Sequence, residues 1–257
     1  MIEDLAALSG LTVEFLTIGF IVFLRVGGTM ALLPALGEQS VPARVRLFLA
    51  LGFTAIVAPS MANTISLNQL QNSLGHLVWT EPVIGLGFGI VLRLMIMVLQ
   101  MAGSIAAQAT SLAQIFGAAG TDPQPAIGHV LMISGLALAV MAGLHVRVAE
   151  GLIMSYEVFP VGTRPEADAY SEWGISRVAQ AFSFAFTLAA PFVIVSLLYN
   201  VALGVINRAM PQLMVAFVGA PAITAGGLIL LLLTTPILLP IWKSAFEATL
   251  HDPFGGW

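Results

Sequence analysis

The chain has 257 residues, of which 58% are hydrophobic and 9% are charged, and its formal net charge is −4. Soluble domains carry about 25% charged residues, so the composition excludes an ordinary soluble core and indicates a polytopic membrane protein. Because cysteine is absent, disulfides, thiolate metal sites and cysteine nucleophiles are excluded. No run of lysine and arginine offers a footprint for nucleic acid. We therefore expect an all-α membrane protein that forms a single domain over residues 1–257.

Six apolar stretches approach the roughly 20 residues that a helix needs to cross a membrane. They cover residues 12–33, 45–62, 83–116, 126–146, 179–203 and 213–242. Glycine and proline interrupt several of them, and such residues are tolerated where neighbouring protein satisfies the freed backbone groups. We expect helical hairpins buried in a larger helical assembly, with coarse subdivisions at 1–125 and 126–257. The acidic start, MIEDLAALSG, lacks the positive region of a signal peptide, so the first stretch is expected to be retained.

Two arginines, Arg25 and Arg93, lie inside apolar stretches. Each either lines a conduit or pairs with another subunit, or else its side chain reaches from a helix end to the membrane surface. Glu81 is the acid nearest in sequence to Arg93. In one helix these two residues are more than three turns apart, which excludes a pair between them within that helix.

The glycine-rich string GLGFG at residues 85–89 superficially resembles a phosphate loop. It opens an apolar helix, however, and no lysine follows it. Close packing of helices through small residues is the better interpretation.

A weakly polar helical segment followed by a flexible one covers residues 103–125, GSIAAQATSLAQIFGAAGTDPQP. Small and apolar groups of this kind can form a dewetting constriction or a movable plug, and the alternative is a plain loop between helices. The candidate plug-like loop covers residues 108–120. Its candidate residues are Gln108, Ile115, Phe116, Gly117 and Gly120.

The one extended polar region covers residues 148–177 and holds five acidic side chains. With its prolines and glycine, it predicts a solvent-facing connection that contains a short amphipathic helix.

A polar elbow is predicted near the C-terminus, where Arg208 is the only charge between Val178 and Trp242. Asn207 can cap a helix there and Pro211 can end one. The positively charged residues do not gather on one side of a six-helix alternation, so the positive-inside rule gives no orientation. We favour an interpretation in which some apolar hairpins lie inside a complex and never cross lipid.

No residues form a convincing catalytic or metal site. The four histidines are scattered, and neither a nucleophile elbow nor a nucleotide-binding loop is present. We predict that the chain is not an enzyme and binds no cofactor. A small-molecule secondary transporter remains a rival, although the two related halves typical of such carriers are not seen. An intramembrane enzyme would need a catalytic dyad, and none is visible.

The string NVALGVINRAMPQL, with VGAP shortly after it, closely resembles a signature of the flagellar biosynthetic protein FliR family. Other segments follow in the order of that family. They are FLRVGGTMALLP with the VPxRxR elbow of Pro42, Arg44 and Arg46, then EPVIGLGFGIVLRL, the DPQ element and the PVG turn at 160–162. The resemblance covers nearly the whole chain.

This resemblance implies a structural and gating subunit of the type III export gate, in the bacterial cytoplasmic membrane at the flagellar basal body. Its implied partners are FliP-like and FliQ-like subunits, an FlhB-like switch subunit, unfolded export substrates and membrane lipid. Pro42, Arg44, Arg46, Asn207, Arg208 and Pro211 are then expected to fix two elbows against partner chains. The sister group, the export-gate subunits of injectisomes, is the alternative within the same family.

Overall fold

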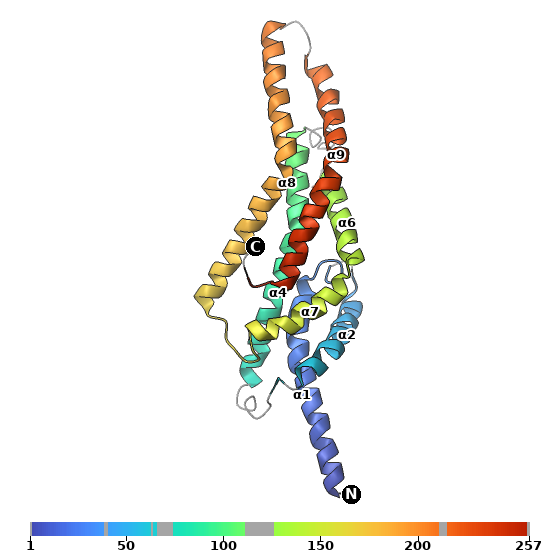
Figure 1. The fold of residues 1–257 in the computed structure, drawn as a ribbon, viewed down its shortest axis with the longest axis vertical. Coiled ribbons are helices and arrows are strands. Elements are labelled where there is room, and N and C mark those ends of the chain that lie inside the picture. Colours follow the sequence, from blue (N-terminus) through green and yellow to red (C-terminus); the bar gives the residue numbers. More distant parts are fainter. Residues whose placement is uncertain are drawn as a thin grey trace. The chain divides into compact units, whose positions relative to one another are not determined.

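The computed structural model describes residues 2–38, 41–62, 64–65, 74–110, 126–210 and 215–255. Every regular element within these ranges is an α-helix (Figure 1). The helices are α1 (Ile2–Leu32), α2 (Ala43–Met61), α4 (Leu74–Ala109), α6 (Ala126–Met141), α7 (Leu144–Val158), α8 (Ala167–Ala209) and α9 (Val215–His251).

Five of these helices are long and apolar enough to cross a membrane, namely α1, α2, α4, α8 and α9. The pair α6 and α7 would add a sixth span, but a 73° bend separates them. Gly143 lies at the bend with φ of 81°, a left-handed conformation that glycine adopts without steric cost. The expected all-α polytopic fold is confirmed, and the fourth predicted stretch is a bent pair of helices.

The predicted polar connection over residues 148–177 is wrong in extent, because most of it is helical. Helix α7 runs to Val158 and α8 already begins at Ala167. The amphipathic helix predicted within this region is present as the last part of α7, where Val148, Leu152 and Tyr156 recur every four residues and are buried. Its acidic residues Glu150 and Glu157 are exposed.

The chain divides into two compact units. The first comprises Met1–Arg93, Val140–Arg177 and Phe246–Trp257, and the second comprises Leu94–Ala139 and Val178–Ala245. Helices α4, α8 and α9 each contribute residues to both units. The single domain over residues 1–257, with its subdivisions at 1–125 and 126–257, stays a prediction.

In the first unit, small residues bring α1 and α4 into close contact. A Cβ added at Gly85 would collide with the carbonyl oxygen of Arg25, and one at Gly89 would lie 2.7 Å from the carbonyl oxygen of Thr29. The hydroxyl of Thr29 donates a hydrogen bond to the carbonyl oxygen of Gly85 at 3.1 Å. The prediction that the GLGFG string serves helix packing is confirmed.

In the second unit, Trp242 of α9 is fully buried and donates its Nε1–H to the carbonyl oxygen of Met95 in α4 at 2.7 Å. Gly135 of α6 leaves room for this indole ring and for Leu99. The hydroxyl of Tyr199 in α8 donates to the carbonyl oxygen of Gly219 in α9 at 2.6 Å. Buried tryptophan and tyrosine side chains thus use their polar ends to join helices of the unit.

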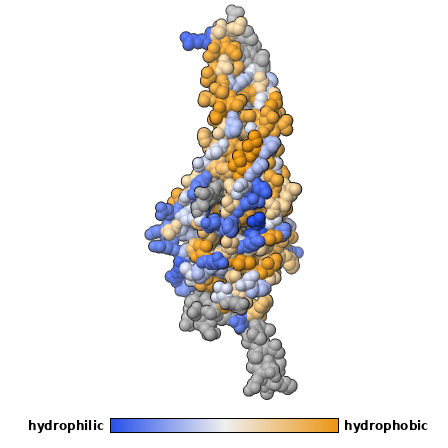
Figure 2. Space-filling view, viewed as in Figure 1, coloured by the Kyte–Doolittle hydropathy of each residue, from blue (hydrophilic) through white to orange (hydrophobic). Residues whose placement is uncertain are grey.

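The surface of the second unit is strongly apolar along α8 and α9. Figure 2 shows mainly orange atoms over the upper parts of these two helices. Exposed side chains of α8 in this unit include Phe182, Phe186, Ile194, Leu198, Val201 and Val205. An apolar surface of this extent requires cover by lipid or by other protein chains.

We expect the Gly85→Leu variant to separate α1 from α4, because the new side chain has no space against the backbone of α1. The expected loss in the free energy of unfolding is ~3 kcal/mol, the upper end for overpacked cores. Thermal unfolding of the detergent-solubilised protein measures it. Gly52→Leu is the matched control, since a Cβ at this exposed position meets nothing within 4 Å. Equal melting temperatures for the two variants would show that this helix contact carries no stability.

Candidate functional site

Arg25 lies in α1 within the first unit, and its side chain is fully buried. Its Nε donates to Oε2 of Glu81 in α4 at 2.8 Å. One terminal nitrogen, Nη1, donates to the hydroxyl of Ser155 at 3.1 Å, and the other, Nη2, donates to the carbonyl oxygen of Phe159 at 2.8 Å. The guanidinium group therefore has a partner on each of its three nitrogens.

Helix α7 presents the remaining parts of this site from one face. The carbon centre of the Arg25 guanidinium lies 3.6 Å from the ring centroid of Tyr156, so the cation stacks on the aromatic face. The hydroxyl of Ser155 accepts from Arg25 and donates to the carbonyl oxygen of Leu152 at 2.6 Å. Both Ser155 and Tyr156 belong to the buried face of the helix.

Glu81 uses its second oxygen to hold the turn that follows α7. Its Oε1 accepts the backbone N–H of Gly162 at 3.2 Å. Gly162 has φ of 80°, which a residue with a side chain rarely adopts. The PVG turn at 160–162 thus has a structural role. It brings a backbone donor to Glu81 and the carbonyl oxygen of Phe159 to Arg25. We call these groups the arginine site: Arg25, Glu81, Ser155, Tyr156 and the turn 159–162.

The arginine site is neutral as a whole, and this makes its burial possible. An unpaired charge at the bilayer centre costs ~2.5–3.5 kcal/mol even on the lenient insertion scale. The ion pair and its additional hydrogen bonds offset the loss of hydration. The hydrogen bonds of the site join α1, α4, α7 and the turn 159–162 within the first unit. They hold these segments together, so the site serves structure.

The two arginines singled out in the sequence differ sharply. Arg25 is buried and pairs with Glu81 inside the chain, and its predicted roles stay predictions. Arg93 is exposed on α4 and does not contact Glu81, in agreement with the exclusion made from their spacing. The sequence did hold a signal for the missed pair: Arg25 and Glu81 are isolated charges of opposite sign that adjoin apolar stretches.

An aromatic cluster adjoins the arginine site and holds the C-terminal residues in the first unit. The ring of Phe159 packs edge-on against Phe254 with centroids 4.9 Å apart, and Tyr170 stacks on Trp173 at 5.1 Å. The hydroxyl of Tyr170 donates to the carbonyl oxygen of Val83 in α4 at 2.9 Å. These contacts fix the first turns of α8 against the same helix that carries Glu81.

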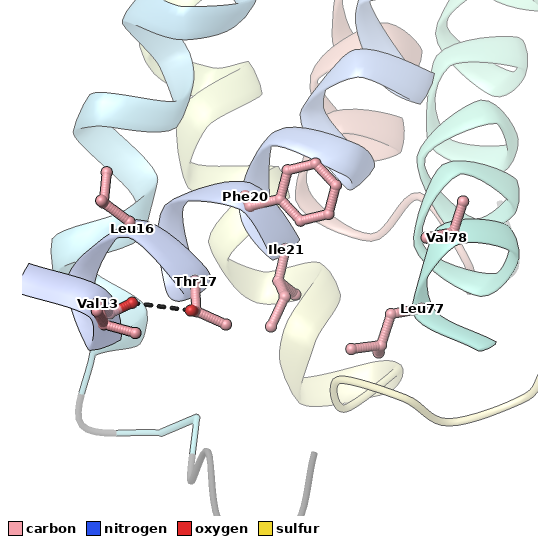
Figure 3. Close-up of a pocket in the computed structure, with 7 residues that line it drawn as sticks. All are labelled: Val13, Leu16, Thr17, Phe20, Ile21, Leu77 and Val78. Atoms are coloured by element: carbon pink, nitrogen blue, oxygen red, sulfur yellow. Dashed lines mark hydrogen bonds between the residues drawn. The ribbon is translucent and has the colours of Figure 1, made fainter. Parts of the chain in front are cut away.

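An apolar groove of about 360 Å³ lies between α1 and the start of α4. Figure 3 shows Phe20 and Ile21 of α1 on the side that faces Leu77 and Val78 of α4. The hydroxyl of Thr17 in the lining donates to the carbonyl oxygen of Val13 at 2.8 Å. None of the lining residues that the structure describes is charged, so the groove is suited to apolar contacts.

The plug-like loop lies almost entirely outside the described residues. Gln108 is exposed in the last turn of α4, whereas Ile115, Phe116, Gly117 and Gly120 fall in the range that the structure does not describe. The end of α4 is fixed within the second unit, because the hydroxyl of Ser196 in α8 donates to the carbonyl oxygen of Ala109.

The predicted elbow residues lie at the ends of helices. Pro42 precedes the first residue of α2, and Arg44 and Arg46 lie in its first turn. Asn207 and Arg208 are exposed in the last turn of α8, so Asn207 is inside this helix and does not cap the next one. Pro211 lies outside the described residues.

We expect the Glu81→Gln variant to lose ~3–5 kcal/mol of stability, because it leaves the buried Arg25 charge without a counter-charge. The double variant Arg25→Met with Glu81→Gln should recover part of this loss, since it buries no charge. Thermal unfolding in detergent and the amount of protein in the membrane measure both effects. Arg93→Gln, at an exposed arginine of α4, is the control. A Glu81→Gln variant as stable as the control would contradict a structural role for the ion pair.

Comparison with known proteins places these features in a family. Residues 16–249 match the family described as bacterial export proteins, family 1. The flagellar biosynthetic protein FliR of Caulobacter vibrioides is 34% identical to this chain, over 90% of the chain and 93% of the relative. The proteins of the same name from Bacillus subtilis and Escherichia coli are each 25% identical, over 90% or more of both chains. The chain therefore belongs to the bacterial export proteins, family 1, which confirms the resemblance to the flagellar biosynthetic protein FliR family found in its sequence.

Proposed function

We propose that this chain is a non-enzymatic structural and gating subunit of the flagellar type III export gate, in the bacterial cytoplasmic membrane at the flagellar basal body. The family assignment supports a role in export, and the relatives reported above are all named as flagellar proteins. This naming favours the flagellar branch over the injectisome branch. The chain would form part of the pore through which unfolded flagellar proteins leave the cell.

The observation that carries the proposal is the length of the charge-free part of α8. No charged residue occurs over the thirty positions from Val178 to Asn207, all of them helical. At 1.5 Å per residue this part is about 45 Å long, whereas the hydrocarbon core of a bilayer is about 30 Å thick. To fit within lipid alone, the helix would have to tilt by almost 50°, beyond the range of about 0–40° seen for such helices.

Part of this apolar helix must therefore be covered by something other than lipid. The exposed side chains run along the whole charge-free part, from Phe182 near its start to Val205 near its end. Cover by neighbouring protein helices meets this requirement, and FliP-like and FliQ-like subunits are the partners that we propose. The exposed Asn207 and Arg208, with Pro211 after them, would contact a partner chain at the end of α8. An FlhB-like subunit is a further proposed partner.

The gating part of the proposal rests on the sequence of the plug-like loop. Small and apolar residues from Ile115 to Gly120 would exclude water and ions while the gate is closed. The bond from Ser196 to the end of α4 supplies a fixed base from which such a loop could extend. Gln108, exposed in the last turn of α4, marks the start of the loop.

We expect Phe182→Lys and Val205→Lys each to abolish assembly with partner subunits. The two positions lie near opposite ends of the charge-free part, about 35 Å apart along the helix, so together they test its cover by partner chains at each end. A lysine buried without a counter-charge against a partner helix would cost ~3–5 kcal/mol. Native mass spectrometry of the complex, solubilised in mild detergent from its native membrane, measures the co-purifying chains.

Ile175→Lys is the matched control, because Ile175 is exposed in the polar first part of α8. It should leave the assembly intact. If one of the two test variants assembled as well as this control, cover of that end by partner chains would be wrong. A wild-type chain that remains a lone monomer or homodimer would refute the export-gate proposal and favour the transporter.

We expect Ile115→Gly to increase ion leakage through the assembled gate, because it removes a water-excluding side chain from the plug-like loop. Leakage is measured in cells that contain the complete gate, with Ile175→Gly as the control for loss of an exposed isoleucine. Unchanged leakage in cells with a normal amount of assembled gate would refute the plug assignment.

A further inference from the structure

A second groove in the first unit lies between α1 and α2, with a volume of about 200 Å³. Among the described lining residues, all side chains are apolar except that of Arg46. The other lining residues are Phe23, Gly27, Met30, Ala31, Ala43, Leu47 and Ala50. Gly27 leaves open space, since a Cβ added there meets no atom within 4 Å.

Arg46 brings a cation to this groove without a described counter-charge. Its Nε is buried and has no hydrogen-bond partner. A buried donor without a partner destabilises the folded state by ~1–3 kcal/mol, and by more when the group is charged. Among the described residues, no acid forms an ion pair with Arg46, and Glu38, in the turn before α2, does not neutralise it. The described lining of the groove thus supplies no anion.

The position of Arg46 in the chain indicates where that anion would lie. Arg44 and Arg46 occupy the first turn of α2, which is a candidate membrane span. No side chain caps this helix start, and backbone N–H groups at a helix start favour negative charge. Arginines at the end of a membrane helix reach toward the headgroup region, where lipid phosphates lie.

We propose that the α1–α2 groove binds an anionic phospholipid, with its phosphate at Arg46 and Arg44 and an acyl chain along the apolar wall next to Gly27. The exposed residues of α2 beside the groove, Val45 and Phe48, are apolar and suit contact with lipid tails. The inference goes beyond the export role and stands on this groove alone.

The test is retention of phosphatidylglycerol by the purified protein, measured by native mass spectrometry after exchange into vesicles that contain equal amounts of phosphatidylglycerol and phosphatidylcholine. The wild-type chain should retain phosphatidylglycerol in preference to phosphatidylcholine. Arg46→Gln should weaken this retention about tenfold or more, because a hydrogen bond to a charged group is lost. Gly27→Leu should weaken it as well, by filling the groove.

Two matched variants serve as controls. Gly52→Leu places the same side chain on the exposed face of α2, and Arg93→Gln removes an exposed arginine from α4. Both should retain the lipid as the wild type does. Gly27→Leu keeps the test decisive if Arg46→Gln fails to fold, since its new side chain enters open space.

Three results would overturn the proposal. The first is equal retention of the two lipids by the wild type, and the second is equal retention of phosphatidylglycerol by the test variants and their controls. The third is loss of phosphatidylglycerol from the wild type when the complete assembly is purified, together with loss of partner chains from the Arg46→Gln variant. This last result would assign Arg44 and Arg46 to a protein contact.

Discussion

The buried ion pair between Arg25 and Glu81 is the interaction on which the first unit depends. An arginine in an apolar helix needs an acceptor for each of its nitrogens, and here three separate segments supply them. This requirement explains features that otherwise look unrelated. Glycines at 85 and 89 let α4 approach α1 closely. Gly162 allows the turn after α7 to return a backbone donor to Glu81.

The second unit is held together differently. Its polar contacts, such as those of Trp242 and Tyr199, join helices inside the unit, while the outer sides of α8 and α9 stay apolar and exposed. Lipid tails are as apolar as leucine, so close packing, more than hydrophobicity, selects the partner of such a helix. A surface of this kind can contact several different neighbours along its length.

The sequence predicted those parts of the structure that depend on local pattern. Apolar length predicted the spanning helices, and the GLGFG string predicted a close helix contact. The mixed polar and apolar residues of 148–177 also predicted the amphipathic helix that forms the last part of α7. The bend at Gly143 was missed, because apolar residues continue on both sides of it. The early start of α8 at Ala167 was missed because the polar residues after Pro165 are typical of a loop. The Arg25–Glu81 pair joins residues 56 positions apart, and no local pattern encodes such a contact.

The same pair constrains how the protein enters the membrane during synthesis. Helix α1 leaves the ribosome before α4 and α7, with a charge whose acidic partner is 56 residues behind it and whose acceptor at Phe159 is 134 residues behind it. At about 5–20 residues per second, the counter-charge arrives roughly 3–11 s later and the turn 159–162 later still. Until then, α1 carries an unpaired charge, whose presence at the bilayer centre would cost ~2.5–3.5 kcal/mol. The free energy of α1 is therefore lowest only once α4 and the turn after α7 have packed against it, which couples the folding of these segments of the first unit.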